Sequence, residues 1–258
     1  MIRVFVQGIG LLGPGLDGWP RGRQVLAEEI AYEPGPVQPP VIGLLPAAER
    51  RRAGFTVRLA IAVGLESLTQ SGCKPADMAM VFAASGGDGA TNHETLEVLA
   101  SAQREVSPTR FHNSVHNAPS GYWAVATGSR APSSSLCAFD DSFAAGFLEA
   151  AVQAVVDDRL VTLIAYDTPY PEPLGSVRRI GFIFAVALVL TPHRTPESLA
   201  ALTLEVEGSH ETGMADADLE RLRLGNPAAR ALPLLAALAT RQSVSVGLGG
   251  LRITVPPA

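Results

Sequence analysis

Two cysteines and five histidines are the residues of this chain that could supply a nucleophile, a general base or a metal ligand. A thiolate is a strong nucleophile, and it forms most readily where a helix N-terminus or a nearby cation lowers the thiol pKa. Cys137 lies just before a run of small and apolar residues that predicts a helix over 143–156, so it is the candidate for such chemistry. Cys73 follows the glycine that ends another predicted helix, and we expect no chemical role for it.

The histidines do not form a metal-binding pattern. Only His112 and His116 lie close together, and no cysteine or evident carboxylate ligand accompanies them. Two cysteines are also too few for a disulfide framework or a structural zinc site. We expect His112 and His116 to stabilise a loop through hydrogen bonds, and His93, His193 and His210 to lie at the surface. The sequence indicates no metal.

Gly8, Gly10 and Gly13 match the spacing G-x-G-x-x-G of dinucleotide-binding proteins, and they follow a run that predicts a strand over 2–6. That chemistry also requires a helix that begins at the second glycine, because the helix N-terminal amides bind the pyrophosphate. A surface-loop sequence beginning with Pro14 follows instead. We interpret the glycines as a turn between a strand and a loop, and we expect no cofactor.

The composition excludes several classes of partner. The 258 residues are 47% hydrophobic and 17% charged, which suits a compact chain with a large core. The net charge is −5 and only residues 50–52 cluster arginines, so we expect no nucleic acid. The N-terminus lacks the layout of a signal peptide, and the longest apolar run, 181–190, is too short to cross a bilayer. We therefore expect a cytoplasmic protein that does not bind membranes.

The elements that must position these residues follow from the apolar patterns. Short apolar runs, several of them apolar on both faces, predict the strands 2–6, 78–84, 133–138, 161–166, 182–190, 202–207 and 243–255. Longer amphipathic or small-residue runs predict the helices 47–70, 91–104, 143–156 and 229–239. We expect 133–138 to be buried, 111–121 to form an irregular loop and 122–127 to begin a helix. The alternation of strands and helices predicts an α/β fold with a mostly covered sheet.

Several segments together resemble β-ketoacyl synthases. The strand and glycine run at 2–14, the helix that starts with a basic cluster at Arg50, and the strand with a glycine-rich exit at 78–89 are similar to successive elements of that family. The run 131–136, which contains Pro132, is similar to the strand that ends at the family's nucleophile. The resemblance covers about the first three-quarters of the chain.

This resemblance implies a thiolase-like layered α/β/α fold. Residues 1–258 would form a single domain, with a complete N-terminal half over 1–175. The chain is much shorter than an active ketosynthase, so residues 176–258 would be a truncated, abbreviated C-terminal half.

The resemblance also implies which chemical groups are present. In active members the nucleophilic cysteine follows the family's proline by eight residues, and eight residues from Pro132 is Asp140. A carboxylate cannot form the acyl thioester that carries a growing chain. The two histidines of the family also have no counterpart, because 225–231 and 243–250 stand where their motifs would be. Asp140 and Asp141 are favoured helix N-caps, and we expect them to cap the following helix.

Residues 111–118 and 165–174 resemble a short subfamily, the chain-length-factor-like proteins encoded beside aryl polyene pigment genes of Gram-negative bacteria. This resemblance implies a non-catalytic subunit that forms a heterodimer with an active β-ketoacyl synthase. It would complete the walls of the tunnel for the growing chain and reach an acyl carrier protein through the complex. The pathway would be type II polyketide or fatty-acid-like elongation, and strand 133–138 would pair antiparallel with its equivalent in the partner.

The same resemblance implies a set of residues at the partner interface or the acyl tunnel. Aromatic side chains are enriched at obligate interfaces, so some of them should face the partner, although Phe111, Tyr122, Trp123, Phe139 and Phe143 are each more typical of a core. The expected residues are Phe111, His112, Asn113, His116, Asn117, Ser134, Leu136, Phe139, Asp140 and Phe143.

Two other functions remain open. The first is an active acyl-transferring enzyme, which would use Cys137 if the nucleophile were displaced by three residues from Asp140. The second is a standalone acyl-binding scaffold that forms a homodimer. A dinucleotide-dependent oxidoreductase is a more distant alternative, because the helix required by the glycine motif is missing.

Overall fold

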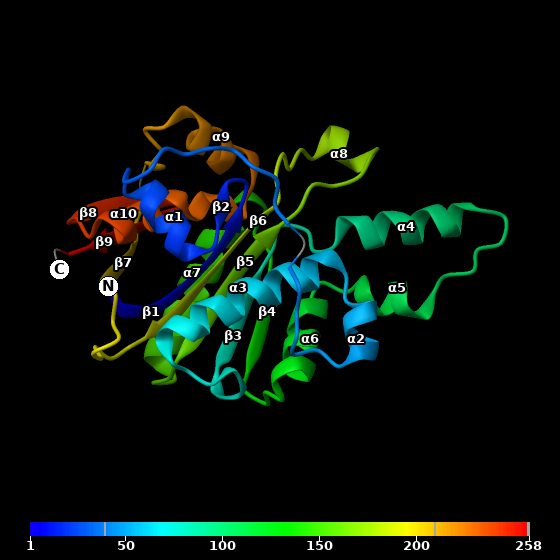
Figure 1. The fold of residues 1–258 in the computed structure, drawn as a ribbon, viewed down its shortest axis with the longest axis horizontal. Coiled ribbons are helices and arrows are strands. Elements are labelled where there is room, and N and C mark those ends of the chain that lie inside the picture. Colours follow the sequence, from blue (N-terminus) through cyan, green and yellow to red (C-terminus); the bar gives the residue numbers. More distant parts are fainter. Residues whose placement is uncertain (39, 209, 257–258) are drawn as a thin grey trace.

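The computed structural model describes residues 1–38, 40–208 and 210–256. Its strands form one mixed sheet in the order β4-β3-β5-β6-β1-β7-β9-β8, with β2 paired to β1 (Figure 1). The strands are β1 (Ile2–Gly13), β2 (Leu16–Asp17), β3 (Ala79–Ala83), β4 (Ser133–Leu136), β5 (Val161–Asp167), β6 (Phe184–Thr191), β7 (Ala200–Val206), β8 (Val244–Leu248) and β9 (Leu251–Val255). The helices are α1 (Trp19–Leu26), α2 (Ala47–Arg52), α3 (Phe55–Ser71), α4 (Gly89–Ala100), α5 (Pro108–Asn113), α6 (Ala118–Thr127), α7 (Ser142–Val156), α8 (Leu174–Val177), α9 (Ala217–Gly225) and α10 (Leu232–Thr240). Three 3-10 turns complete the set, η1 (Pro75–Asp77), η2 (Phe139–Asp141) and η3 (Ala228–Ala231).

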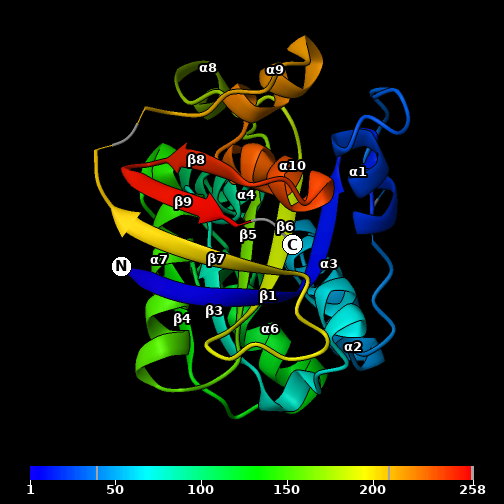
Figure 2. The same cartoon turned by 90° about the vertical axis from the view of Figure 1, so that its left-hand side faces the viewer.

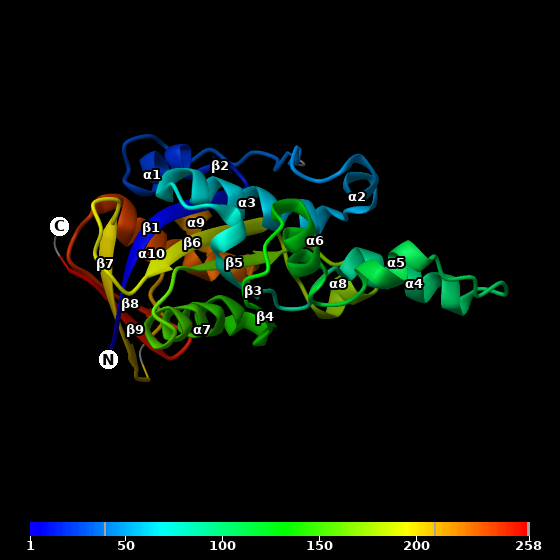
Figure 3. The ribbon, with the colours of Figure 1, turned by 90° about the horizontal axis from the view of Figure 1, so that it is seen from below.

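Helices cover both faces of this sheet. Figure 3 shows α3 and α7 on opposite sides of the strands. On β5, Leu163 packs into the core beneath α7 and α10, whereas Ile164 packs into the core beneath α3 and α6. All eight residues of β6 are buried, as expected for a strand covered on both faces. The structure therefore confirms a layered α/β/α fold.

The parallel part of the sheet creates a common edge. Strands β3, β4 and β5 run parallel, and β6 is antiparallel to both β5 and β1. The segments that leave the carboxyl ends of β3, β4 and β5 therefore meet at one end of the sheet. Beyond β1, at the sheet edge opposite β4, β7 and the β8–β9 hairpin extend the sheet beside α10 (Figure 2).

Strand β1 contains a register shift that decides the role of its glycines. The shift lies between Val6 and Gly8, and it keeps Val6 and Ile9 in the same core although they are three residues apart. The predicted turn at Gly8–Gly13 is therefore wrong, because these glycines lie inside the long strand β1.

The glycines of β1 allow helix α3 to lie directly on the strand. A Cβ atom on Gly8 would fall 2.0 Å from the backbone oxygen of Ser67, and one on Gly10 would fall 1.9 Å from that of Val63. Any side chain at these positions would push the helix off the sheet. The glycines at this G-x-G spacing therefore allow α3 to pack closely on β1.

Strand β7 pairs with only the first part of β1. Beyond that part, two side chains of α3 form hydrogen bonds with the backbone groups of β1 that have no strand beside them. Glu66 accepts hydrogen bonds from the backbone N–H of Leu11 at 2.9 Å and of Trp19 at 2.5 Å. Gln70 donates to the carbonyl of Ile9 at 2.9 Å. Burial raises the pKa of Glu66, while its two backbone donors oppose that shift. These contacts replace a neighbouring strand.

Other sequence-based element predictions need correction. The helix predicted over 47–70 is two helices, because Ala53 and Gly54 are extended and Gly54 precedes the first turn of α3. The loop predicted over 111–121 contains parts of α5 and α6, and each of these helices has a proline in its first turn. The strand predicted as buried at 133–138 is the half-exposed edge strand β4.

The predicted boundary at residue 175 falls between β5 and β6, which lie side by side in the sheet. Helices α4 and α5 project from the body as an arm (Figure 1). Among the described residues, every helix is too short or too polar to cross a bilayer.

Candidate functional site

The candidate site lies where β3, β4 and β5 end. In open α/β sheets, ligands bind beside the carboxyl ends of parallel strands. The segments that gather there are 84–89 after β3, 137–141 after β4 and 168–183 after β5.

A buried carboxylate, Asp167, ends β5 at the centre of this site. Its Oδ1 atom accepts hydrogen bonds from the backbone N–H of Ser85 at 2.9 Å and from the Ser85 hydroxyl at 2.7 Å. Its Oδ2 atom is buried and has no hydrogen-bond partner within the described part of the chain. Burial raises the pKa of Asp167 to about 7, against the opposing effect of the two Ser85 donors. Near neutral pH this carboxyl is therefore partly protonated.

The surroundings hold Asp167 in place. The Asn226 side chain donates to the backbone oxygens of Asp167 at 3.1 Å and of Phe182 at 2.7 Å. The ring of Tyr170 lies so close to the loop after β3 that a Cβ atom on Gly89 would fall 2.1 Å from it. Burial raises the pKa of Tyr170, and its hydrogen bond with Ser85 opposes that shift.

The turn that leads into α7 is clamped by Arg178. The guanidinium of Arg178 lies 2.7 Å from Oδ1 of Asp140 and stacks over the ring of Phe139, 3.7 Å from its centroid. Phe139 has a positive φ of 53°, an uncommon conformation for a bulky residue. Arg178 is largely buried, so this double contact fixes the turn more strongly than a surface ion pair would.

Asp140 and Asp141 were expected to cap the following helix, and that prediction is wrong. Asp141 precedes the first residue of α7 without a side-chain capping bond, and Asp140 binds Arg178 instead. The hydroxyl of Ser142 bonds back to the turn before the helix, accepting from the backbone N–H of Ala138 at 3.0 Å and donating to the backbone oxygen of Phe139 at 2.8 Å. The reason is the extra 3-10 turn η2, which moves the start of the α-helix to Ser142.

Cys137, His116 and Cys73 each have their own surroundings in the structure. Cys137 is exposed and lies between β4 and η2, five residues before α7 begins at Ser142. The ring of His116 faces the backbone oxygen of Ala84, with Nε2 at 3.2 Å, in keeping with the loop-stabilising role that we expected. The Cys73 thiol lies 3.9 Å from the side-chain oxygen of Gln7. A search of the described residues finds no group of side chains suited to a metal ion.

The residues predicted at a partner interface fall into two groups, one buried in this chain and the other exposed to solvent. Asn113 and Phe143 are buried within this chain and offer no surface to a partner. Asn113 donates to the backbone oxygen of Arg52 at 2.8 Å and accepts from the hydroxyl of Tyr122 at 3.0 Å. The remaining residues are exposed or half-exposed on α5, the α5–α6 connection, β4 and η2; they are Phe111, His112, His116, Asn117, Ser134, Leu136, Phe139 and Asp140.

The α4–α5 arm carries an apolar groove. A cavity of about 670 Å³ lies between the two helices, and the side chains of Leu96 and Phe111 beside it are 63% and 68% exposed. The ion pair between Arg110 and Glu94, at 2.9 Å, joins α5 to α4. Exposed apolar surface of this kind is typical of interaction sites.

Sequence reasoning missed Asp167, Ser85 and Arg178. A carboxylate directly after the fully apolar strand 161–166 was the available signal for Asp167. Arg178 gave no signal, because its partner Asp140 lies 38 residues away in the sequence.

The buried carboxylate Asp167 makes the stability of the protein depend on pH. Its pKa is raised from 3.8 to about 7 on folding, so the folded state keeps this proton longer than the unfolded state. This group's stabilising effect is full below pH 3.8 and is lost as pH rises to about 7, on the order of 1 kcal/mol for each pH unit.

We therefore expect Asp167→Asn to be more stable than wild type at pH 8, because its amide oxygen can still accept from Ser85. Urea unfolding at pH 5 and pH 8 measures the change. Asp77→Asn, which removes an exposed carboxylate, is the control. An Asp167→Asn protein that keeps the wild-type pH dependence would contradict the assignment.

Comparison with known proteins identifies the family to which this layered α/β/α chain belongs. A family model described as "Beta-ketoacyl synthase, N-terminal domain" matches residues 24–243. The chain therefore belongs to the family of β-ketoacyl synthase N-terminal domains. No curated protein sequence matches the chain.

Solved structures share this fold at low sequence identity. One is the ketosynthase ApeO in complex with its chain length factor ApeC from Xenorhabdus doucetiae, with a TM-score of 0.75 at 22% identity over 99% of this chain and 100% of that one. Another is the ishigamide ketosynthase/chain length factor, with a TM-score of 0.67 at 10% identity over 98% of each chain. A β-ketoacyl synthase from Burkholderia phymatum has a TM-score of 0.62 at 12% identity over 88% of this chain and 71% of that one.

Proposed function

We propose that this chain is a non-catalytic subunit, similar to chain length factors, that pairs with an active β-ketoacyl synthase. The observation that carries the proposal is the turn into α7, where Asp140 is bound by Arg178 and no thiol is present. A carboxylate engaged by an arginine cannot accept an acyl group from a thioester under the conditions of chain elongation.

The position of Cys137 supports this proposal. A reactive cysteine needs a helix N-terminus or a cationic neighbour to lower its pKa. Cys137 lies before η2 on the exposed segment after β4, and the guanidinium nearest the turn, Arg178, is already paired with Asp140. The arrangement favours a silent subunit over an enzyme that uses Cys137.

The edge strand β4 supports the pairing. Pro132 and Leu136 accept hydrogen bonds from the backbone of β3, at 3.0 and 3.2 Å. Because alternate residues of a strand point their backbone groups to opposite sides, Ser133 and Ser135 point theirs away from β3. An unpaired edge of this kind is suited to antiparallel pairing with a strand of another subunit. The exposed groove of the α4–α5 arm would add apolar area to the same interface.

Further parts of the proposal follow from the relatives. Two of the similar structures are described as complexes of a ketosynthase with a chain length factor, and a third as an acyl carrier protein bound to its ketosynthase. By that likeness this chain would act in the cytoplasm in type II polyketide or aryl polyene elongation, with the carrier protein reached through the complex. Residues 1–175 and 176–258 would correspond to a complete and a shortened half of the ketosynthase fold.

Co-expression with a ketosynthase encoded beside this chain tests the proposal. We expect the two proteins to copurify and to show the mass of a heterodimer by light scattering. A homodimer that persists in the presence of the synthase would favour the scaffold alternative. Acylation of the isolated chain, lost in Cys137→Ala, would favour the enzyme alternative.

A further inference from the structure

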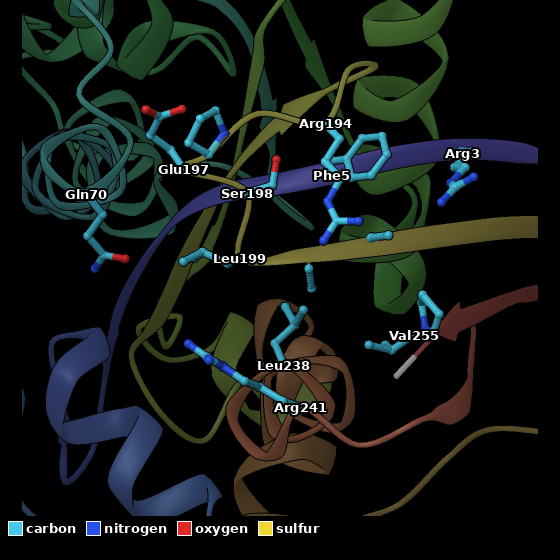
Figure 4. Close-up of a pocket in the computed structure, with 14 residues that line it drawn as sticks. Arg3, Phe5, Gln70, Arg194, Glu197, Ser198, Leu199, Leu238, Arg241 and Val255 are labelled. Atoms are coloured by element: carbon cyan, nitrogen blue, oxygen red, sulfur yellow. The ribbon is translucent and has the colours of Figure 1, made fainter. Parts of the chain in front are cut away.

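A second cavity lies at the opposite end of the sheet from the candidate site. Phe5 of β1 pairs with Thr191 at the end of β6, whereas Asp167 pairs with Phe184 at its start. The length of β6 therefore separates the two regions by roughly 25 Å. The cavity has a volume of about 800 Å³ and lies between the starts of β1 and β7, the loop after β6 and the ends of α10 and β9 (Figure 4).

Three arginines line this cavity, Arg3 from β1, Arg194 from the loop after β6 and Arg241 from the end of α10. Within the described part of the chain, none of the three has a carboxylate within ion-pair distance, although Glu197 also lines the cavity. Figure 4 shows Arg194 and Arg241 on opposite walls of the hollow. In a protein with a net charge of −5, this concentration of unpaired positive charge favours an anion.

The backbone at Arg241 supports a role for its side chain. Arg241 directly follows α10 with a positive φ of 53°, the left-handed conformation that usually ends helices at glycine. Glycine would adopt this conformation at lower cost, although the helix dipole favours a basic side chain at this helix end. A ligand for the guanidinium would add a second reason for an arginine here.

The opposite wall is held in a fixed shape. In the loop that carries Arg194, the backbone N–H of Thr195 donates to the Ser198 hydroxyl at 2.9 Å. The hydroxyl of Thr195 accepts from the side chain of Gln7, at 2.7 Å, and Gln7 is the buried residue at the register shift of β1. The cavity is therefore formed before any ligand binds, which lowers the cost of binding.

We propose that this cavity binds a small molecule in which at least two negative charges, from phosphate or carboxylate groups, are joined to an apolar group. The guanidiniums suit phosphate and carboxylate oxygens, which they bind through paired hydrogen bonds. Apolar walls from Phe5, Leu199, Leu238 and Val255 suit the uncharged part. The volume falls within the range of small-molecule sites.

Calorimetry with two dianions of similar size tests the proposal and separates the two anion types. We expect phenyl phosphate, isophthalate or both to bind at low salt, more weakly at high salt, and benzyl alcohol not to bind. Arg241→Gly should weaken binding about tenfold or more while thermal stability is kept or raised. Arg51→Ala, an exposed arginine on α2, is the matched control and should bind as wild type does.

Three results with small molecules would overturn the proposal. They are no binding of either dianion at millimolar concentration, equal binding by Arg241→Gly and wild type, and binding of benzyl alcohol as tight as that of the dianions. Capture of an acidic protein by wild type without binding of either dianion would also overturn it, in favour of a macromolecular partner. None of these results bears on pairing with a ketosynthase.

Discussion

Ser135→Pro should abolish copurification with the ketosynthase while leaving this chain folded. Ser135 points its backbone N–H away from β3, because its neighbour Leu136 bonds to β3. Proline there removes an outward donor but no hydrogen bond of the chain's own sheet. The partner subunit's strand that pairs with β4 would no longer receive a hydrogen bond from residue 135, so one of its backbone oxygens would be left without a donor. We expect the affinity of the heterodimer to fall by about 100-fold, or about 3 kcal/mol.

The matched control for this change is Ser135→Ala, which keeps the N–H and should copurify normally. Thermal unfolding of each isolated variant shows whether the chain's own fold is kept. A folded Ser135→Pro chain that still forms the heterodimer at wild-type affinity would show that β4 does not carry the interface.

Gly10→Ala should destabilise the fold severely. The added Cβ atom would fall 1.9 Å from the backbone oxygen of Val63, and a helix backbone cannot rotate away as a side chain can. Helix α3 would have to move off β1, which disturbs the acceptor contacts of Glu66 and the core beneath it. We expect a loss of at least about 3 kcal/mol in the free energy of unfolding, a large share of a typical total.

Urea unfolding measures this loss, and Gly121→Ala provides its control. Gly121 lies inside α6, and no atom lies within 4 Å of the Cβ position there. Alanine should therefore stabilise that helix by about 0.5–1 kcal/mol. Equal stabilities for the two variants would contradict the close packing of α3 on β1.

The sequence predicted the elements whose pattern is strong. The apolar run 182–190 became the doubly covered strand β6, and the small-residue run 143–156 became α7 with a start one residue earlier. Both patterns are local, since burial on two faces or on a helical stripe shows directly in residue type. The alternation of such patterns predicted the α/β fold, which the structure confirms. The family resemblance, which rested on short motifs along the chain, is also confirmed.

The sequence did not predict features that depend on contacts between distant segments. The helix α6 was predicted only over 122–127, because Gly121 and the proline in its first turn made the pattern of its start resemble a loop. The roles of Gly8 and Gly10 depend on where α3 lies, and the fixing of Asp140 depends on Arg178. The interface and tunnel residues implied by resemblance stay a prediction, and the burial of Asn113 and Phe143 leaves only the tunnel role open to those two.

The most direct test of the silent-subunit account is mass spectrometry of the intact heterodimer after incubation with an acyl thioester. We expect the acyl group on the ketosynthase alone and this chain at its unmodified mass, because Asp140 occupies the turn before α7 and Cys137 lies outside it. An acyl group on this chain that maps to Cys137 and disappears in Cys137→Ala would contradict the account.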